Sequence, residues 1–552
     1  MKTNLIYRNL LICLMAFAVV SCQTKINPEI PHLKKQGTAT QLIVDGKPFL
    51  LLGGEVYNSS SSSLDYMKPA WAKLARMNLN TVLVPVSWEQ FEPVEGKYNF
   101  LLVDSLIKDA RQHNLRVVFL WLATWKNGNS RYAADWVKTD QKRFPRVQDK
   151  DGKTLEILST LCEETCKADA RAFAALMKHI KETDAEKRTV LMMQVENEVG
   201  MHSDSRDRCA MANAAFANQV PKELMEYLQK HKENLLPEFF KVWKNAGTKT
   251  SGTWEEIFGK STATDEIFMA WHYATFINRV AEAGKAQYAL PMYVNAWLVQ
   301  PQDKVPGNYP SGGPVDHVHD IWRAGAPQID ILAPDIYVAD FNGTVARYSR
   351  GGNPLFVPES RGDTTGAANA FYAIGQYGSM GYSPFGIDRE NEKDALSKAY
   401  EVLSQLSPLI LKYQGTGSIG AASLNKANPE QMLKMGNYNI RIGLRKNFWD
   451  AKDSPAMGYG IIINTGHDEF IASGNDIDIT FEPAGDSIAG LISVEEGKFV
   501  NSQWMAGRRL NGDEVQLRYD LSVAAKEKQS GAGLRFPKNE YSIQKVKLYL
   551  YK

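Results

Sequence analysis

The sequence predicts an α/β fold, a (β/α)8 TIM barrel followed by a C-terminal all-β sandwich domain. Short apolar runs alternate with helix-like segments from Leu42 to about Tyr413. After Tyr413, short strand-like runs are separated by turns rich in Gly, Asn and Asp. The length of 552 residues exceeds the size at which one hydrophobic core stops growing. We therefore expect at least two domains.

The first residues are typical of an export signal. Lys2 and Arg8 supply the charge, Leu10 to Val20 form an apolar core, and a small-residue site ends in Cys22. This pattern resembles a bacterial lipoprotein signal, which is cleaved before a cysteine that then carries lipid; the alternative is an ordinary secretory signal with an incidental cysteine. We assign residues 1–21 to the signal and 22–40 to a tether. The membrane contact expected is a lipid anchor alone, at the outer membrane on its periplasmic face or the cell surface.

The barrel is assigned to residues 41–414, with one apolar run for each of the eight strands that such a barrel needs. The expected strands are 50–55, 81–87, 116–122, 190–198, 291–297, 331–337, 355–359 and 381–385. Helical patterns fall between or after them, at 64–77, 101–113, 168–181, 267–283 and 392–412. The stretch from Met201 to about Lys260 is too long for a simple connection, so we expect extra helices there, with Trp254 and Trp271 as candidate cleft residues.

The sandwich is assigned to residues 415–552, where strand-like runs include 460–464, 477–481, 515–521 and 546–551. A structural role against the barrel is the favoured interpretation, and glycan binding is the alternative.

Two glutamates stand at the carboxyl ends of expected barrel strands, where barrel enzymes place their reacting groups. Glu198 ends the run Gln194-Val195-Glu196-Asn197-Glu198, and Glu359 ends the apolar run that begins at Pro354. Read alone, each has a structural alternative, as a surface glutamate that caps a strand or as part of a turn. Together they supply the two carboxyl groups that hydrolysis of a glycosidic bond requires, one to protonate the leaving oxygen and one to attack the sugar or activate water.

Composition is compatible with a carbohydrate substrate. The 64 Lys and Arg residues nearly balance 62 Asp and Glu, which argues against a nucleic-acid partner. Aromatic residues make up 10% of the chain, including 12 Trp and 23 Tyr, and flat rings suit the apolar face of a sugar. No cofactor is expected. Cys162, Cys166 and Cys209 remain after the signal; they form no four-ligand metal set, and a bridge between the first two is left open.

The barrel resembles glycoside hydrolase family 35, the retaining β-galactosidases, and the C-terminal part resembles a β domain of one bacterial subgroup. The motifs that carry the resemblance are Trp88, Glu92-Pro93, Gly96, Tyr98 and Phe100, followed by Gln194 to Glu198 and Gly200. The resemblance implies that Glu198 is the general acid/base, Glu359 the nucleophile and Asn197 a donor to the sugar 2-hydroxyl. It implies release of terminal β-linked galactose, here from plant-type oligosaccharide or polysaccharide side chains.

The chain departs from the family at positions that contact the sugar. Pro85 replaces a tyrosine, Ala123-Thr124-Trp125 replaces Ala-Glu-Trp, and Arg361 stands where many relatives carry tyrosine. Replacement contacts are expected from residues near the ends of the first, third and sixth strands: Glu55, Tyr57, Asn58, Trp125, Asn127 and Tyr337. A β-glucosidase-like specificity and an inactive glycan-binding surface lipoprotein are the alternatives.

One motif invites a metal interpretation, namely Asp316-His317-Val318-His319-Asp320. We expect this segment to begin a helix, where residues two apart point to nearly opposite faces and cannot share an ion. No metal site is predicted.

Overall fold

The computed structural model describes residues 29–389, 394–445, 455–515 and 532–552. The predicted signal, residues 1–21, and Cys22 lie outside the described residues. Within the described part, no helix combines the length and the apolar character that a membrane crossing requires.

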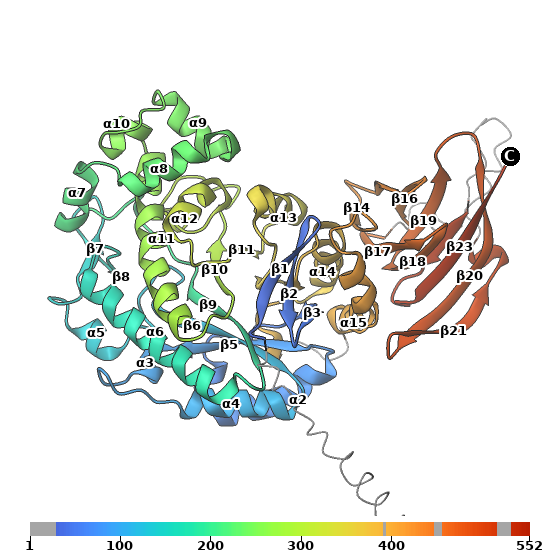
Figure 1. Cartoon of the computed structure of the whole chain (residues 1–552), viewed down its shortest axis with the longest axis horizontal. Coiled ribbons are helices and arrows are strands. Elements are labelled where there is room, and N and C mark those ends of the chain that lie inside the picture. The colour runs from blue at the N-terminus through green and yellow to red at the C-terminus, as the bar shows by residue number, and fades with distance from the viewer. Residues whose placement is uncertain (1–28, 390–393, 446–454, 516–531) are drawn as a thin grey trace, which may run out of the picture.

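A curled parallel sheet forms the centre of the first domain, which is TIM-barrel-like (Figure 1). Its strand order is β12-β11-β10-β9-β6-β5, and every neighbouring pair is parallel. All six strands overlap the predicted runs. They are β5 (Thr81–Ser87), β6 (Arg116–Lys126), β9 (Val190–Asn197), β10 (Met292–Trp297), β11 (Ile331–Ile336) and β12 (Glu359–Ser360).

The other two predicted strands are short and form a separate parallel pair, β4 (Leu51–Leu52) with β13 (Gly381–Tyr382). Single bridges connect this pair to both edges of the larger sheet. Glu55 bridges Leu83 of β5, and Val357, just before β12, bridges Tyr382. The eight expected runs therefore follow one another around the sheet, although six share a continuous ladder and two do not.

Helices cover the outside of this sheet because each has one apolar face. In α4 (Leu101–Gln112) the buried residues Val103, Leu106, Ile107 and Ala110 follow helical spacing. Ser or Asp side chains cap several of the helices, as in α2 (Leu64–Arg76), α11 (Thr262–Gln287), α14 (Thr364–Tyr377) and α15 (Ala395–Tyr413). The others over the sheet are α3 (Trp88–Phe91), α5 (Asp135–Thr139), α6 (Glu163–Asp184), α12 (His319–Gly325) and α13 (Phe341–Tyr348).

Extra helices follow β9, as predicted for the long connection. They are α7 (Ala210–Ala217), α8 (Lys222–Lys230), α9 (Pro237–Asn245) and α10 (Trp254–Phe258). Trp254 does not line a cleft: it is 1% exposed and packs edge-on against Phe268 of α11. Trp271 is also buried, at 8% exposure. The expectation of cleft residues there is corrected, because both rings fill the core between these helices.

An antiparallel sheet precedes the barrel and corrects the predicted tether of residues 22–40. It comprises β1 (His32–Gln36), β2 (Ala39–Val44) and β3 (Lys47–Phe49). The Gln36 amide donates to the carbonyls of Leu411 and Lys412 at the end of α15. The segment from His32 onward is therefore part of the folded domain.

The C-terminal region is built from two antiparallel sheets that share one buried apolar cluster. The first sheet has the order β14-β17-β18-β23-β20-β21, and the second β15-β16-β19-β22. The strands are β14 (Ile419–Asn425), β15 (Glu430–Met435), β16 (Tyr438–Leu444), β17 (Met457–Gly466), β18 (Glu469–Asn475), β19 (Ile477–Pro483), β20 (Ile488–Val500), β21 (Gln503–Leu510), β22 (Gly533–Phe536) and β23 (Ile543–Tyr551).

The outer face of the first sheet packs against α14, which joins the two domains (Figure 1). Gly375 makes this approach possible. A Cβ atom at this position would lie 2.7 Å from the Ala421 Cβ and 3.0 Å from the Ile461 side chain. Ala421, Ile461 and Ile463 consequently belong to the same buried cluster as the barrel helices.

The three cysteines in the described residues are free and buried. Cys162 donates to the Arg143 carbonyl and Cys166 to the Phe276 carbonyl, so the two thiols have different partners.

Candidate active site

The end of β9 has an unusual backbone. Glu196 and Glu198 have φ values of 62° and 45°, in the left-handed region that side-chain-bearing residues rarely adopt. Gly200 follows at φ 141°, and a Cβ there would lie 2.5 Å from Pro310. This sharp turn directs the two glutamates to different surroundings.

Glu196 lies beside another buried carboxyl group, that of Asp169. Its oxygens accept the backbone N–H groups of Thr124 and Trp125, at 3.1 and 2.6 Å. Burial, followed by the charge of Asp169, raises the pKa of Glu196 well above its ordinary value. Asp169 accepts from the Trp121 indole and the Thr124 hydroxyl. We interpret Glu196 as a support for the irregular end of β6.

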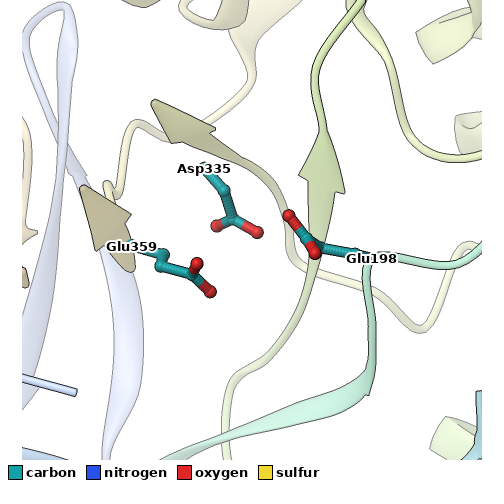
Figure 2. Close-up of side chains that lie close together, drawn as sticks. All are labelled: Glu198, Asp335 and Glu359. Carbon is teal, nitrogen blue, oxygen red and sulfur yellow. The ribbon is translucent and has the colours of Figure 1, made fainter. Parts of the chain in front are cut away.

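Three carboxylates converge at the carboxyl ends of β9, β11 and β12. One oxygen from each of Glu198, Asp335 and Glu359 lies within 4.8 Å of the others. Figure 2 shows these side chains pointing toward one another, Asp335 and Glu359 from two strands and Glu198 from the segment just after β9. The structure thus brings together the two glutamates named from sequence, which are 161 positions apart, and adds an aspartate.

Amide side chains position Glu198 and Asp335. Asn127 donates from Nδ2 to Oε2 of Glu198 at 2.6 Å. Asn295 accepts the backbone N–H of Glu198 at 3.0 Å and donates to Asp335 at 2.6 Å. The carboxyl group of Glu198 is therefore held by its side chain and by its backbone.

Glu359 has a different partner. The Tyr337 hydroxyl donates to Oε1 of Glu359 at 2.8 Å, while Oε2 is buried and has no hydrogen-bond partner in the described part of the chain. A donor to one oxygen stabilises the ionised form. Oε2 is thus the carboxylate oxygen that is free to react.

The surroundings of Glu198 and Glu359 shift the pKa values of the two carboxyl groups to different extents. Burial and then the charge of Glu359 raise the pKa of Glu198 to about 7. Burial also raises the pKa of Glu359, but the positive charge of Lys126 and the Tyr337 hydroxyl oppose that rise. Glu359 accordingly loses its proton first, and its charge keeps Glu198 protonated. Two carboxyl groups whose environments push their pKa values apart are typical of acid/base assignments.

Several buried polar atoms that have no hydrogen-bond partner among the described residues face the same region. Neither carboxyl oxygen of Glu55 has a hydrogen-bond partner, and burial together with the charge of Glu359 raises its pKa well above the ordinary value. Asn197 accepts from Lys126 through Oδ1 at 2.8 Å, whereas its Nδ2 is unpartnered. The Tyr293 hydroxyl is likewise buried and unpartnered. Such groups are costly unless a ligand satisfies them.

Three more residues, Tyr57, Asn58 and Trp125, were predicted to contact the sugar. Tyr57 and Asn58 are half-buried after β4, with the Tyr57 ring 4.8 Å from Phe385 and beneath the Arg389 guanidinium. The prediction that Trp125 contacts the sugar is corrected by the structure. Its ring packs against Tyr273 and Phe276 of α11, and its indole donates to the Leu158 carbonyl. This tryptophan is a core residue because its side chain points to the helix layer.

Sequence reasoning missed Asp335, Asn295 and Lys126. Each is a polar residue in the second half of an otherwise apolar barrel strand, a signal similar to the one that identified Glu198. Trp297, the last residue of β10, was also missed; it is 36% exposed and packs edge-on against His202.

The two histidines of the Asp316–Asp320 motif have different partners. His317 pairs with Glu266 at 2.7 Å, whereas His319 contacts the Pro314 carbonyl. The two rings do not share a centre. The Glu198, Asp335 and Glu359 cluster, by contrast, has carboxyl oxygens close enough together to share a cation.

Comparison with known proteins gives two regions of similarity to family models. A model described as Beta-galactosidase (Glyco_hydro_42) matches residues 56–276, and a model described as a domain of unknown function matches residues 396–522. The first match includes Glu198, Asn127 and Asn197 but ends before Glu359.

Two curated proteins are similar to part of this chain. A Beta-galactosidase of Xanthomonas manihotis is 28% identical over 207 residues, which is 36% of this chain and 31% of that protein. Beta-galactosidase 14 of Arabidopsis thaliana is 26% identical over 191 residues, or 33% of this chain and 20% of that protein. The chain therefore matches a third or less of the length of these relatives.

Among solved structures, a beta-galactosidase from the psychrophilic Marinomonas ef1 superposes with a TM-score of 0.43 at 13% identity, over 65% of this chain and 60% of that one. The family model and the two curated relatives support a glycoside hydrolase of the clan that contains the beta-galactosidases.

Proposed function

We propose that this protein is a retaining exo-glycoside hydrolase that releases terminal β-linked galactose from plant-type oligosaccharide or polysaccharide side chains. The observation that carries the proposal is the pairing of Glu198, whose pKa is raised to about 7, with Glu359, whose ionised form Tyr337 stabilises. One carboxyl group is thus a proton donor near neutrality and its neighbour is a nucleophile. Family 35 membership, an eight-stranded (β/α)8 barrel and a C-terminal sandwich belong to the same proposal.

The first chemical step forms a glycosyl-enzyme. Oε2 of Glu359 attacks the anomeric carbon while the Glu198 carboxyl proton passes to the departing oxygen. The bond between that carbon and the leaving oxygen breaks as the ester bond to Glu359 forms. Glu359 is neutral once the ester has formed, so its negative charge no longer raises the pKa of Glu198.

The second step regenerates the enzyme. Glu198, now ionised, takes a proton from water, and the water oxygen attacks the anomeric carbon and displaces Glu359. Asn127 stabilises the ionised Glu198 through its Nδ2–H group. Two displacements at one carbon retain its configuration. Retaining enzymes hold their carboxyl groups about 5–5.5 Å apart; the oxygens of Glu198 and Glu359 lie within 4.8 Å, which favours this outcome.

The buried groups beside the carboxylates supply hydroxyl recognition. Asn197 Nδ2 is the proposed donor to the sugar 2-hydroxyl, and Glu55 offers two acceptor oxygens to other hydroxyls. The exposed rings of Trp297 and Tyr337 offer flat apolar surfaces at adjacent strand ends. Tyr57 and Asn58 follow Glu55 along the chain and complete this side of the proposed sugar site.

A screen of aryl β-glycosides tests the proposal. We expect the β-galactoside to be hydrolysed faster than the β-glucoside, with β-galactose as the first product anomer in an NMR time course and with turnover unchanged by a chelator. Preference for the glucoside would favour a β-glucosidase-like specificity. Binding without turnover of any glycoside would identify an inactive glycan-binding protein.

Export and anchoring remain a separate proposal, supported by the charged, apolar and small-residue segments that end at Cys22. We propose that the protein is lipidated on Cys22 and held at the outer membrane, on its periplasmic face or the cell surface. Mass analysis of the mature N-terminus in wild type and in Cys22→Ser tests it; an unmodified Cys22 in the mature wild-type protein contradicts it.

A further inference from the structure

A cavity lies between the barrel and the C-terminal domain, beside the catalytic carboxylates. Its volume is about 410 Å³, which falls within the usual range for ligand pockets. The barrel contributes the segment from Ile336 to Asn342 together with Arg361, Thr365 and Asn369. The C-terminal domain contributes Ser423 to Asn425, Asn428 and Met457. The cavity therefore exists only when the two domains are packed together.

Tyr337 connects this cavity to the reaction site. The residue lines the cavity, and its hydroxyl donates to Glu359 at 2.8 Å. Tyr337 is 40% exposed, so part of its ring is available to a ligand. Arg361, two residues after Glu359, lines the same space. A molecule that reaches from the carboxylates into the cavity would pass along these two side chains.

The lining has the chemistry that binds neutral sugars. Hydroxyl and amide groups come from Tyr337, Thr365, Ser423 and Asn428, and the apolar residues Leu424 and Met457 also line the cavity. Within the described residues, the Arg361 guanidinium makes no hydrogen bond or ion pair, so its donors are available. The Asp340 carboxylate adds little negative charge to the cavity, because its oxygens accept hydrogen bonds from the Gly343 N–H and from Arg347. Such mixed donors and acceptors around an aromatic ring suit hydroxyl groups and a pyranose face.

We propose that this cavity is a second glycan subsite, built by both domains, that holds sugar units of the substrate beyond the unit that is cleaved. The inference rests on the proposed function and deepens it. The C-terminal domain, beyond packing against α14, then contributes directly to selection of an oligosaccharide over a simple galactoside. The turn between β14 and β15, which connects the two sheets of the C-terminal domain and carries Asn428, forms one wall of the subsite.

A direct binding test uses methyl signals in the full chain. The Glu359→Gln variant prevents turnover, and Met457 reports on the cavity, while Met432, 52% exposed on β15, is a control methyl in the same domain outside the lining. Neutral β-linked galacto-, gluco- and xylo-tetrasaccharides are the probes. We expect at least one of them to shift the Met457 signal with saturation, whereas galactose alone and Met432 show no change. Absence of a Met457 shift with every tetrasaccharide overturns the inference.

A kinetic test separates this inference from the proposed function. Asn428→Trp fills the cavity, and Asn439→Trp places the same ring at an exposed position of β16 outside it. For the tetrasaccharide that is hydrolysed, we expect Asn428→Trp to lower kcat/KM about tenfold or more while the aryl galactoside changes less than about twofold. Asn439→Trp should leave both values unchanged. Equal changes on both substrates overturn the subsite, whereas wild type without activity on any galactoside contradicts the proposed function and leaves the Met457 test decisive.

Discussion

Asn127 donates a hydrogen bond of 2.6 Å from Nδ2 to Oε2 of Glu198, and its own backbone has a left-handed φ of 52°. The amide therefore reaches the carboxyl group from a turn that few residue types tolerate. A hydrogen-bond donor favours the ionised carboxylate, so this contact opposes a rise in the pKa of Glu198. Lys126 and Asp335 also oppose the rise that burial causes. Asn127 is a positioning residue for the proposed acid/base.

Replacement of Asn127 should shift the alkaline limb of the pH profile. Asn127→Gly removes the amide but keeps a residue that tolerates positive φ. The ionised form of Glu198 loses its donor, so its pKa rises and the alkaline limb of kcat/KM moves to higher pH, while kcat/KM at the optimum falls roughly tenfold to a hundredfold. Asn114→Gly is the matched control, since Asn114 is exposed and also has a φ of 56°. An alkaline limb that moves to lower pH in Asn127→Gly would contradict the assigned hydrogen bond.

The wild-type pH profile should be bell-shaped with its alkaline limb near pH 7. Glu198 acts as an acid only while protonated, so activity is lost as pH rises through its pKa of about 7. Glu359 attacks only when ionised, so activity is also lost as pH falls through its own raised pKa. The kcat/KM profile for an aryl galactoside measures both limbs, which belong to the coupled pair. A profile that keeps rising above about pH 8 would exclude Glu198 as the acid.

Glu198→Ala should affect substrates according to their leaving groups. An activated aryl galactoside needs little protonation, whereas an oligosaccharide should lose about 10²–10⁴-fold in rate. Azide should restore part of the turnover of the activated substrate, because it attacks the glycosyl-enzyme without base assistance. Glu196→Ala offers a contrast, since Glu196 binds the Thr124 and Trp125 N–H groups and supports the strand end. Rescue of Glu196→Ala rather than Glu198→Ala by azide would move the acid/base assignment.

The proposed nucleophile can be trapped as a covalent intermediate. A 2-deoxy-2-fluoro galactoside with a good leaving group slows both steps but the second more, so the glycosyl-enzyme accumulates. Peptide mapping should locate the label on Glu359, and Glu359→Gln should prevent labelling without loss of the fold. Label on Glu55 or Asp335, which lie in the same buried region, would reassign the nucleophile.

Gly375 should be essential for the packing of the two domains. Gly375→Leu places side-chain atoms where Ala421 and Ile461 already lie, at 2.7 and 3.0 Å from the first added carbon. Overpacking of this kind costs about 1–3 kcal/mol, so thermal unfolding should begin at a lower temperature. Thr364→Leu, at an exposed position of the same helix, is the control and should have little effect. Equal melting temperatures for the two variants would contradict tight packing at this interface.

Much of the fold could be predicted because each buried strand is an apolar run that ends at a polar residue. The runs at Thr81–Ser87 and Val190–Asn197 are strands in the structure, and Glu198 was located by the same pattern. The prediction of sugar contacts failed where a strand-end side chain could point either to the site or to the helix layer. Trp125 lies next to Lys126 at the strand end, yet its ring packs on α11 because the strand is irregular there.

The sequence by itself determined the alternation of strands and helices, the change to a β-rich region near Tyr413, and Glu198 and Glu359 as strand-end carboxylates. These are local properties, because apolar spacing and turn residues act over a few positions. Only the tertiary structure decided that Asp335 joins the two glutamates and that Tyr337 favours ionised Glu359. It also decided that the β14–β15 turn lines the same cavity as Arg361. Those relationships depend on burial and on contacts between segments far apart in the chain, which strand curvature and domain packing create.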